Sequence, residues 1–230
     1  MYYPVSDNMG ETHHHLVARH LLYALLTDYV RRTRLPAFVG SDLFFYYQRG
    51  NPRAVVCPDN YIVDGEPKPG KVSSWKVWER GGQVPTLAIE IVSDEFKKDY
   101  SDHLLERYEQ LGVRELIRFD PEHAAHRRRK ALSHFIRNDA GRLIEHLGLP
   151  DRVRSRCYNL WFVLQPNDQL RIATGPDGST LWPTQDERAD AEAEARAAEA
   201  KARAAEEKAR AAAEARAEAA EAELARLRNR

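Results

Sequence analysis

Two acidic residues accompany aliphatic segments in which a charged side chain is unusual. Glu90 lies inside residues 86–92, a run that is otherwise almost entirely aliphatic or β-branched and that predicts a buried central strand. Asp59 follows a shorter apolar segment, residues 54–57, after the rigid Pro58, at a point where we expect the chain to leave a sheet. Removing an ionised carboxylate from water costs several kcal/mol unless it is paired, protonated or bound to a cation.

This pair of carboxylates has two interpretations. Two acidic groups on neighbouring strands are the minimum that can hold a hard divalent cation through oxygen ligands. Alternatively, Glu90 forms an ion pair with an arginine or lysine and Asp59 caps a turn. The spacing alone does not decide between a metal site and these structural roles.

The surrounding pattern predicts a mixed α/β (α+β) fold. We expect a first amphipathic helix from the N-cap Thr12 to Pro36 and a second that ends at Gly112, because apolar residues recur there at helical spacing. Residues 63–82 are expected to be irregular and anchored by Trp75 and Trp78. Strands are predicted at residues 37–40, 43–47, 54–57, 86–92, 115–119, 132–136, 143–147, 157–164 and 170–174. The succession of strand, helix and strand around the second helix suits a crossover between parallel strands.

A change of composition divides the chain into residues 1–183 and residues 184–230. The first part carries all four tryptophans and can form one domain with a sizeable core. From Asp186 onward the chain is almost only Ala, Glu, Arg, Lys and Asp, which predicts one long solvated helix with ion pairs four residues apart. Leu224 and Leu227 are its only large apolar residues. A firm coiled coil is therefore not expected, although the helix could serve as an assembly arm for a homo-oligomer.

Charge and cysteine content restrict the class of protein. The chain has 35 basic and 35 acidic residues, so any affinity for nucleic acid must be local. Cys57 and Cys157 lie in apolar segments and are expected to be reduced core thiols of a cytoplasmic protein. No signal peptide and no membrane-spanning run is recognisable.

Two further groups of residues invite a functional interpretation. The consecutive His13, His14 and His15 resemble a metal site, but successive helical residues point about 100° apart and cannot all converge on one ion. We therefore expect a solvated helix start. A basic cluster could contact phosphates or form a solvated hairpin loop; its members are His123, His126, Arg127, Arg128, Arg129, Lys130 and Arg137.

The order of these motifs resembles that of the Uma-two type restriction endonuclease family, a branch of the PD-(D/E)XK nuclease superfamily. The resemblance rests on Pro58-Asp59, on residues 85–93 around Glu90, on residues 112–115 and on Asp120-Pro121. Residues 76–79, Asp99 and Tyr108 also match. It covers most of residues 12–183 and implies a restriction-endonuclease-like core, a mixed sheet of about four or five strands flanked by helices.

The same resemblance implies a metal-dependent DNA endonuclease that hydrolyses phosphodiester bonds. Asp59 and Glu90 would hold Mg²⁺ or Mn²⁺, and the backbone carbonyl of Ile91 could add a ligand; Glu11 is a further candidate carboxylate. The superfamily lysine two residues after the glutamate is Val92 in this chain.

In the Uma-two family a lysine in the following helix takes that role, and His103 occupies its position here. His103 and Lys98 are therefore the predicted catalytic residues beside the two carboxylates, with Lys97 as a neighbouring source of charge. Two other functions remain open. One is a catalytically degenerate nuclease-fold module that binds nucleic acid or protein, and the other is a scaffold for the alanine-rich helix.

Overall fold

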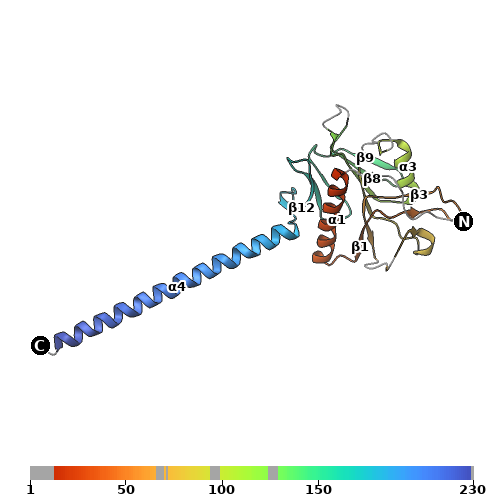
Figure 1. Cartoon of the computed structure of the whole chain (residues 1–230). Coiled ribbons are helices and arrows are strands. Elements are labelled where there is room, and N and C mark those ends of the chain that lie inside the picture. The colour runs from red at the N-terminus through yellow and green to blue at the C-terminus, as the bar shows by residue number, and fades with distance from the viewer. Residues whose placement is uncertain (1–12, 66–69, 71, 94–98, 124–128, 229–230) are drawn as a thin grey trace. The chain divides into compact units, whose positions relative to one another are not determined.

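The computed structural model describes residues 13–65, 70, 72–93, 99–123 and 129–228 (Figure 1). It divides into two units, residues 1–182 and 183–230, and so places the boundary one residue before the predicted one. The first unit contains a mixed central sheet. In spatial order its six strands are β1 (Ala37–Ser41), β4 (Asn60–Asp64), β6 (Leu87–Ile91), β7 (Glu115–Phe119), β8 (Leu132–Arg137) and β9 (Leu143–His146).

The middle of this sheet is its parallel part. Strands β6 and β7 run parallel, with Glu90 opposite Arg118, and are connected by helix α3 (Asp102–Leu111). The other pairs of the sheet are antiparallel. Helix α3 starts where the Ser101 side chain accepts a hydrogen bond from Leu104 N, and it ends at Gly112, whose φ of 97° requires a residue without Cβ strain. The predicted crossover between parallel strands is therefore confirmed.

Different elements cover the two faces of the sheet. One face packs against helix α1 (His13–Thr33) and a four-stranded antiparallel sheet. The strands of that sheet are β10 (Arg152–Arg154), β11 (Trp161–Leu164), β12 (Leu170–Thr174) and β13 (Thr180–Leu181). The opposite face packs against α3 and a small sheet of β3 (Val55–Val56), β2 (Phe45–Tyr46) and β5 (Trp75–Lys76), and β5 is followed by the short 3₁₀ helix η1 (Val77–Glu79).

The side-chain alternation of strand β6 decides which face Glu90 occupies. Ile89 and Ile91 belong to the core on the α1 face, and Ala88 belongs to the core on the α3 face. Because successive side chains of a strand point to opposite faces, Glu90 points to the same face as Ala88, toward α3.

The structure corrects several sequence predictions. The main sheet has six strands instead of four or five, and its strand β4 covers residues 60–62, for which no strand was predicted, and the first two residues of the stretch 63–82 that was expected to be irregular. The strand predicted at residues 157–164 begins only at Trp161. The cysteines are not core thiols, since Cys57 is half-buried and Cys157 is exposed. Of the two loop tryptophans only Trp75 is fully buried.

The second unit contains one helix, α4 (Gln185–Arg228), as predicted. It begins with a reciprocal cap, in which Thr184 N donates to Glu187 Oε2 at 2.7 Å and Glu187 N donates to Thr184 Oγ1 at 3.2 Å. The ion pairs Glu192–Arg196 and Glu199–Arg203 form as expected, whereas Arg210 pairs with Glu214 and not with Glu206. None of its residues is buried. Within the described ranges, no helix is long and apolar enough to cross a bilayer.

Candidate functional site

Asp59 and Glu90 face each other across two neighbouring strands. The register of β4 and β6 pairs Asn60 with Ile89, and extending it by one residue places Asp59 opposite Glu90. Asp59 Oδ2 accepts a hydrogen bond from Ile91 N at 2.7 Å, which fixes this carboxylate against the next residue of β6. Asp59 therefore stands at the start of β4. The sequence had placed it at the end of a strand leaving the sheet.

The side chain of His15, from the first turns of α1, reaches the same place. Its Nε2 lies 3.2 Å from Asp59 Oδ1 and 3.0 Å from the carbonyl oxygen of Ile91. Both side chains are largely buried, with exposed fractions of 14% for His15 and 15% for Asp59. The Asp59 carboxylate and the Ile91 carbonyl oxygen thus both contact the same imidazole nitrogen, His15 Nε2.

Glu90 is held by a tyrosine from α3. Tyr108 is fully buried and donates its hydroxyl hydrogen to Glu90 Oε1. Burial raises the pKa of Glu90 well above its ordinary value, and the nearby charge of Asp59 raises it further, against a smaller lowering by the Tyr108 hydrogen bond. The pKa of Tyr108 is also raised, by burial and then by the charge of Glu90. Two carboxylates close enough to disfavour each other's charge form a site that a cation would stabilise.

A third carboxylate and an arginine border the pair. Asp99 is 8% exposed, and its Oδ2 accepts hydrogen bonds from Ser93 N at 2.8 Å and Ser93 Oγ at 2.9 Å. Arg118, opposite Glu90 on β7, donates from Nη1 to the backbone oxygen of Asp99 at 3.1 Å, and its guanidinium carbon lies 4.1 Å from the centre of the Tyr100 ring. In the part of the chain that the structure describes, the buried Arg118 Nε has no hydrogen-bond partner. Arg118 is therefore the neighbour of Glu90 on the next strand, with its guanidinium held at Asp99 and Tyr100.

The donor set of this site fits a hard divalent cation. Asp59, Glu90 and the Ile91 carbonyl offer oxygen atoms only, which is the chemistry that Mg²⁺ and Mn²⁺ prefer. Asp59 Oδ1 and Ile91 O already share a contact with one nitrogen, so one small cation could contact both oxygens. Among the described residues, no three His, Cys, Asp or Glu side chains form a metal-binding group. The candidate centre accordingly consists of two carboxylates and a backbone carbonyl.

Comparison with known proteins identifies the family. The model of the Uma2 family, described as "Putative restriction endonuclease", matches residues 6–166, which is well over half of the 230 residues. This chain belongs to the Uma2 family. Among solved structures it is similar to a putative nuclease belonging to DUF820 from Anabaena variabilis ATCC 29413, with 13% identity, a TM-score of 0.37 and coverage of 80% of this chain and 79% of that chain. No curated protein matches the chain.

The structure places the other predicted residues of this Uma2 protein as follows. His103 lies on α3 with 69% of its side chain exposed, and its Nδ1 is 3.7 Å from Glu106 Oε2, so in this structure it points to solvent. Val92, at the position of the superfamily lysine, is 3% exposed. Lys97, Lys98 and Glu11 lie outside the described residues. The catalytic roles of His103 and Lys98 stay predictions.

The described members of the basic cluster have structural partners. Arg129 forms a bidentate ion pair with the fully buried Asp120. Lys130 pairs with Glu145 at 2.7 Å, and Arg137 donates to the backbone oxygen of Glu109 at 2.9 Å. These contacts favour the hairpin interpretation over a phosphate-binding patch for these three residues.

Sequence reasoning missed Arg118, and it was wrong about His15, which was expected at a solvated helix start but is largely buried. Three consecutive histidines cannot share one ion, but on a helix with one buried face one of them must point inward. His15 lies seven residues before Leu22, which is fully buried, so it continues the buried face of α1 by two turns. That spacing is the signal which could have distinguished His15 from its two neighbours.

Proposed function

We propose that this Uma2 protein is a metal-dependent DNA endonuclease that hydrolyses phosphodiester bonds at the site of Asp59 and Glu90. The proposal is supported by membership of a family of restriction endonuclease type. The observation that carries it is the convergence of Asp59 and the Ile91 carbonyl on one point, next to a Glu90 whose pKa is raised. DNA is the substrate class that the family description suggests.

In this proposal each residue has a distinct task. Asp59, Glu90 and the Ile91 carbonyl would hold Mg²⁺ or Mn²⁺. Such an ion, when bound, lowers the pKa of a coordinated water and offsets the charge of the scissile phosphate. The Tyr108 hydroxyl fixes the orientation of Glu90, and the hydrogen bond from Ile91 N fixes that of Asp59.

A positive charge near the phosphate is the remaining requirement. Arg118 is a candidate because it is held opposite Glu90 by Asp99 and by Ser133, whose Oγ accepts from Arg118 Nη2 at 3.3 Å. A planar guanidinium remains charged at neutral pH and can bond two phosphate oxygens. His103 and Lys98 remain the alternatives suggested by the family pattern.

The test is plasmid nicking with Mg²⁺ or Mn²⁺ by the full-length protein and its variants. We expect Glu90→Gln and Asp59→Asn to abolish nicking, and calorimetry with Mn²⁺ to show weaker binding in both. The exposed Glu79, whose side chain is 57% accessible, provides the control variant Glu79→Gln, which should nick at the normal rate. Unchanged Mn²⁺ affinity in Asp59→Asn would contradict the proposed metal ligands.

A second candidate function is a nuclease-fold module that binds without cleaving. It is favoured by the replacement of the family's helix lysine by His103, whose side chain is exposed. Under this alternative, plasmid would bind without being nicked in Mg²⁺ or Mn²⁺, and Glu90→Gln would bind as well as the original protein.

A further inference from the structure

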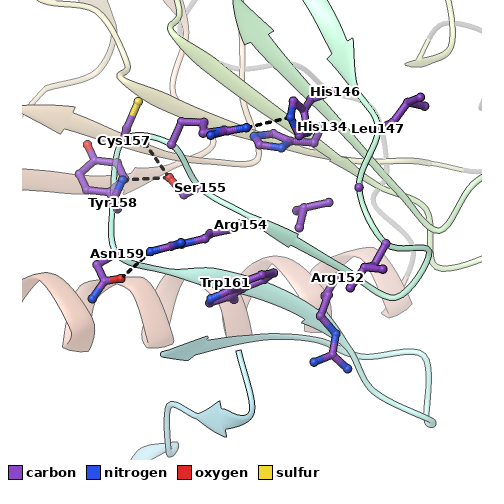
Figure 2. A pocket seen from close by; sticks show the side chains of 14 residues that line it. His134, His146, Leu147, Arg152, Arg154, Ser155, Cys157, Tyr158, Asn159 and Trp161 are labelled. Carbon is purple, nitrogen blue, oxygen red and sulfur yellow. Dashed lines mark hydrogen bonds between the residues drawn. The ribbon is translucent and has the colours of Figure 1, made fainter. Parts of the chain in front are cut away.

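A cavity of about 720 Å³ lies beside the loop that connects β9 and β10 (Figure 2). We name it the arginine pocket because three arginines line it; its charged or aromatic lining residues are His134, His146, Arg152, Arg154, Arg156, Tyr158 and Trp161. No Asp or Glu side chain lines it within the part of the chain that is described. We propose that the arginine pocket binds a phosphate group of a phosphorylated ligand.

The pocket is separate from the candidate metal site. His134 is in register with Ile117, which in turn is in register with Ile89. These residues point to the face of the central sheet that packs against α1. Glu90 points to the α3 face, so the sheet itself separates the two sites. A ligand of the arginine pocket therefore does not need the acidic pair.

Strand alternation gathers the arginines on one side. Val153 and Ser155 are each 4% exposed, whereas the intervening Arg154 and the following Arg156 are exposed. Residues two apart on a strand share a face, so Arg152 and Arg154 of β10 lie on one side, and Arg156, in the bend that follows β10, lines the same cavity. Three guanidinium groups that line one cavity offer several N–H donors, which suits a group with more than one negative charge.

Arg154 and Arg156 retain N–H donors for a ligand, whereas Arg152 is engaged by its neighbours. Arg152 is engaged by Asp151, with Nη2 2.8 Å from Oδ2, and by the backbone oxygen of Asp177 at 3.1 Å from Nη1. Arg154 lies 5.8 Å from the centre of the Trp161 ring and has one long bond of 3.4 Å to Asn159. A guanidinium carries five N–H donors, so most of those on Arg154 are not used by this bond.

Arg156 has an unusual neighbour. Its Nη2 lies 2.8 Å from His146 Nε2 (Figure 2). The arginine must donate here because it has no acceptor, so the imidazole nitrogen accepts. His146, which also lines the pocket, thereby orients the Arg156 guanidinium. A phosphate oxygen is a stronger acceptor for this donor than a neutral imidazole.

The indole ring of Trp161, which lies beside Arg154, is held by the adjacent loop. Trp161 Nε1 donates to the carbonyl oxygen of Gly175 at 3.0 Å. A Cβ at Gly178, where φ is +71°, would lie only 2.7 Å from the indole Cγ, so glycine permits this close approach. The indole cannot easily rotate, and it keeps Arg154 at a constant position.

A buried glutamate holds the floor of the pocket in place. Glu115 is fully buried, and its Oε2 accepts from Ser155 Oγ at 2.6 Å while its Oε1 accepts from Arg156 N at 2.7 Å and from His134 Nε2 at 2.6 Å. Its negative charge is thus bound by donors of the protein beneath the pocket surface. The loop that carries Arg154 and Arg156 is preorganised by these bonds, which lowers the cost of ordering it around a ligand.

Phosphate fits this lining better than a carboxylate does. A tetrahedral group with about two negative charges accepts from donors on several sides, whereas a planar carboxylate is satisfied by one guanidinium. The rim of the cavity is apolar, since Leu147 is 85% exposed and Leu149 is 58% exposed. A nucleotide, free or at the end of a DNA strand, combines such a phosphate with a base that could lie against this rim.

The experiment measures binding of four probes to the full chain by calorimetry. The probes are inorganic phosphate, adenosine monophosphate and a short oligothymidylate with and without a 5′-phosphate. We expect Arg154→Ala and Arg156→Ala each to weaken the phosphate-bearing probes about tenfold, or about 1.4 kcal/mol. The control is Arg196→Ala on α4, where the side chain is 82% exposed, and it should leave affinity unchanged. Melting followed by tryptophan fluorescence verifies folding.

The probes also distinguish the source of the phosphate. Tighter binding of the 5′-phosphorylated oligonucleotide than of the mononucleotide would assign the pocket to a DNA end, and comparable binding would assign it to a free nucleotide. The proposal fails if neither arginine variant weakens phosphate binding more than Arg196→Ala does. It also fails if acetate displaces the mononucleotide as effectively as phosphate does.

Discussion

Replacement of Glu115 by glutamine is expected to destabilise the first unit, because Glu115 receives hydrogen bonds from two separate segments, strand β8 and the chain that follows β10. Its two oxygens accept from His134 Nε2, Ser155 Oγ and Arg156 N at 2.6 to 2.7 Å. Hydrogen bonds to a charged group contribute about 1.5–3 kcal/mol, and neutral ones about 1 kcal/mol. Losing the charge from three bonds should therefore lower the free energy of unfolding by roughly 2 kcal/mol. Alanine, which removes every acceptor, should cost about 3–5 kcal/mol.

The pH dependence gives a second measure of the same interaction. Burial disfavours the Glu115 charge, but the bonds from His134, Ser155 and Arg156 outweigh it, so the pKa of Glu115 is lowered. A carboxyl group with a lowered folded-state pKa contributes stability above its unfolded value, about 4.3, and that contribution is lost as pH falls through the folded pKa. The difference between the original protein and Glu115→Gln should consequently shrink in acid.

The assay is urea unfolding followed by tryptophan fluorescence. All four tryptophans lie in residues 1–182, whereas circular dichroism would be dominated by the 44 residues of α4. Glu145→Gln is the matched control, because Glu145 is 37% exposed and its ion pair with Lys130 lies at the surface. It should cost less than about 1 kcal/mol. Equal effects of the Glu115 and Glu145 substitutions at neutral pH would refute the reasoning.

Four further predictions follow from the described geometry. Glu90→Gln should raise the free energy of unfolding, and the gain should grow as pH rises above about 4.3, the unfolded-state pKa. The reason is that the original protein loses stability as pH rises through the raised folded-state pKa of Glu90, by about 1.4 kcal/mol for each unit of the increase. Urea titrations with no such gain would contradict this prediction. His15→Ala should tighten Mn²⁺ binding about threefold to tenfold in calorimetry, because Nε2 donates to two of the proposed ligand oxygens and so competes with a cation; weaker binding would instead make His15 a ligand. His103→Lys should increase metal-dependent nicking, and no gain in a folded variant would leave Arg118 or Lys98 as the source of charge. Deleting residues 186–230 should leave the fluorescence melt unchanged because no residue of α4 is buried; if α4 joins copies of the chain, light scattering at several concentrations should show a lower mass after deletion.

The sequence predicted the central strands better than the strands at the margins. The run around Glu90 and the segment at residues 115–119 are apolar on both faces, which is the pattern of a strand covered on two sides. β4 was largely missed because it starts with the polar Asn60, although that residue is fully buried and its side chain donates to the backbone of Arg19 at 3.2 Å. A polar residue that is buried through a hydrogen bond to a distant helix carries no local signal. β10 was missed because two of its three residues are arginines.

The acidic pair was recognised from its surroundings, but its partners were not. Asp59 and Glu90 are acidic residues in or next to apolar segments, so the local sequence pattern is enough to select them. His15 and Arg118 join them only through tertiary structure, from a helix 44 residues before Asp59 and from the next strand of the sheet. His103 was expected near the site from its family position and from the apolar residues beside it, but its side chain is at the surface. Tyr108 points inward and His103 does not, because the two residues lie on different sides of helix α3.

The length of α4 sets a distance within the second unit. At 1.5 Å per residue, Leu227 lies roughly 60 Å along the helix axis from Gln185. Leu224 and Leu227 are 57% and 61% exposed, so they are the apolar contacts that this helix offers. The helix therefore sets a distance as well as offering a contact surface. A partner bound by these leucines would be separated from Gln185 by about twice the thickness of a bilayer's hydrocarbon core. Inserting or removing whole turns would change that separation by about 5.4 Å each while keeping the leucines on the same side.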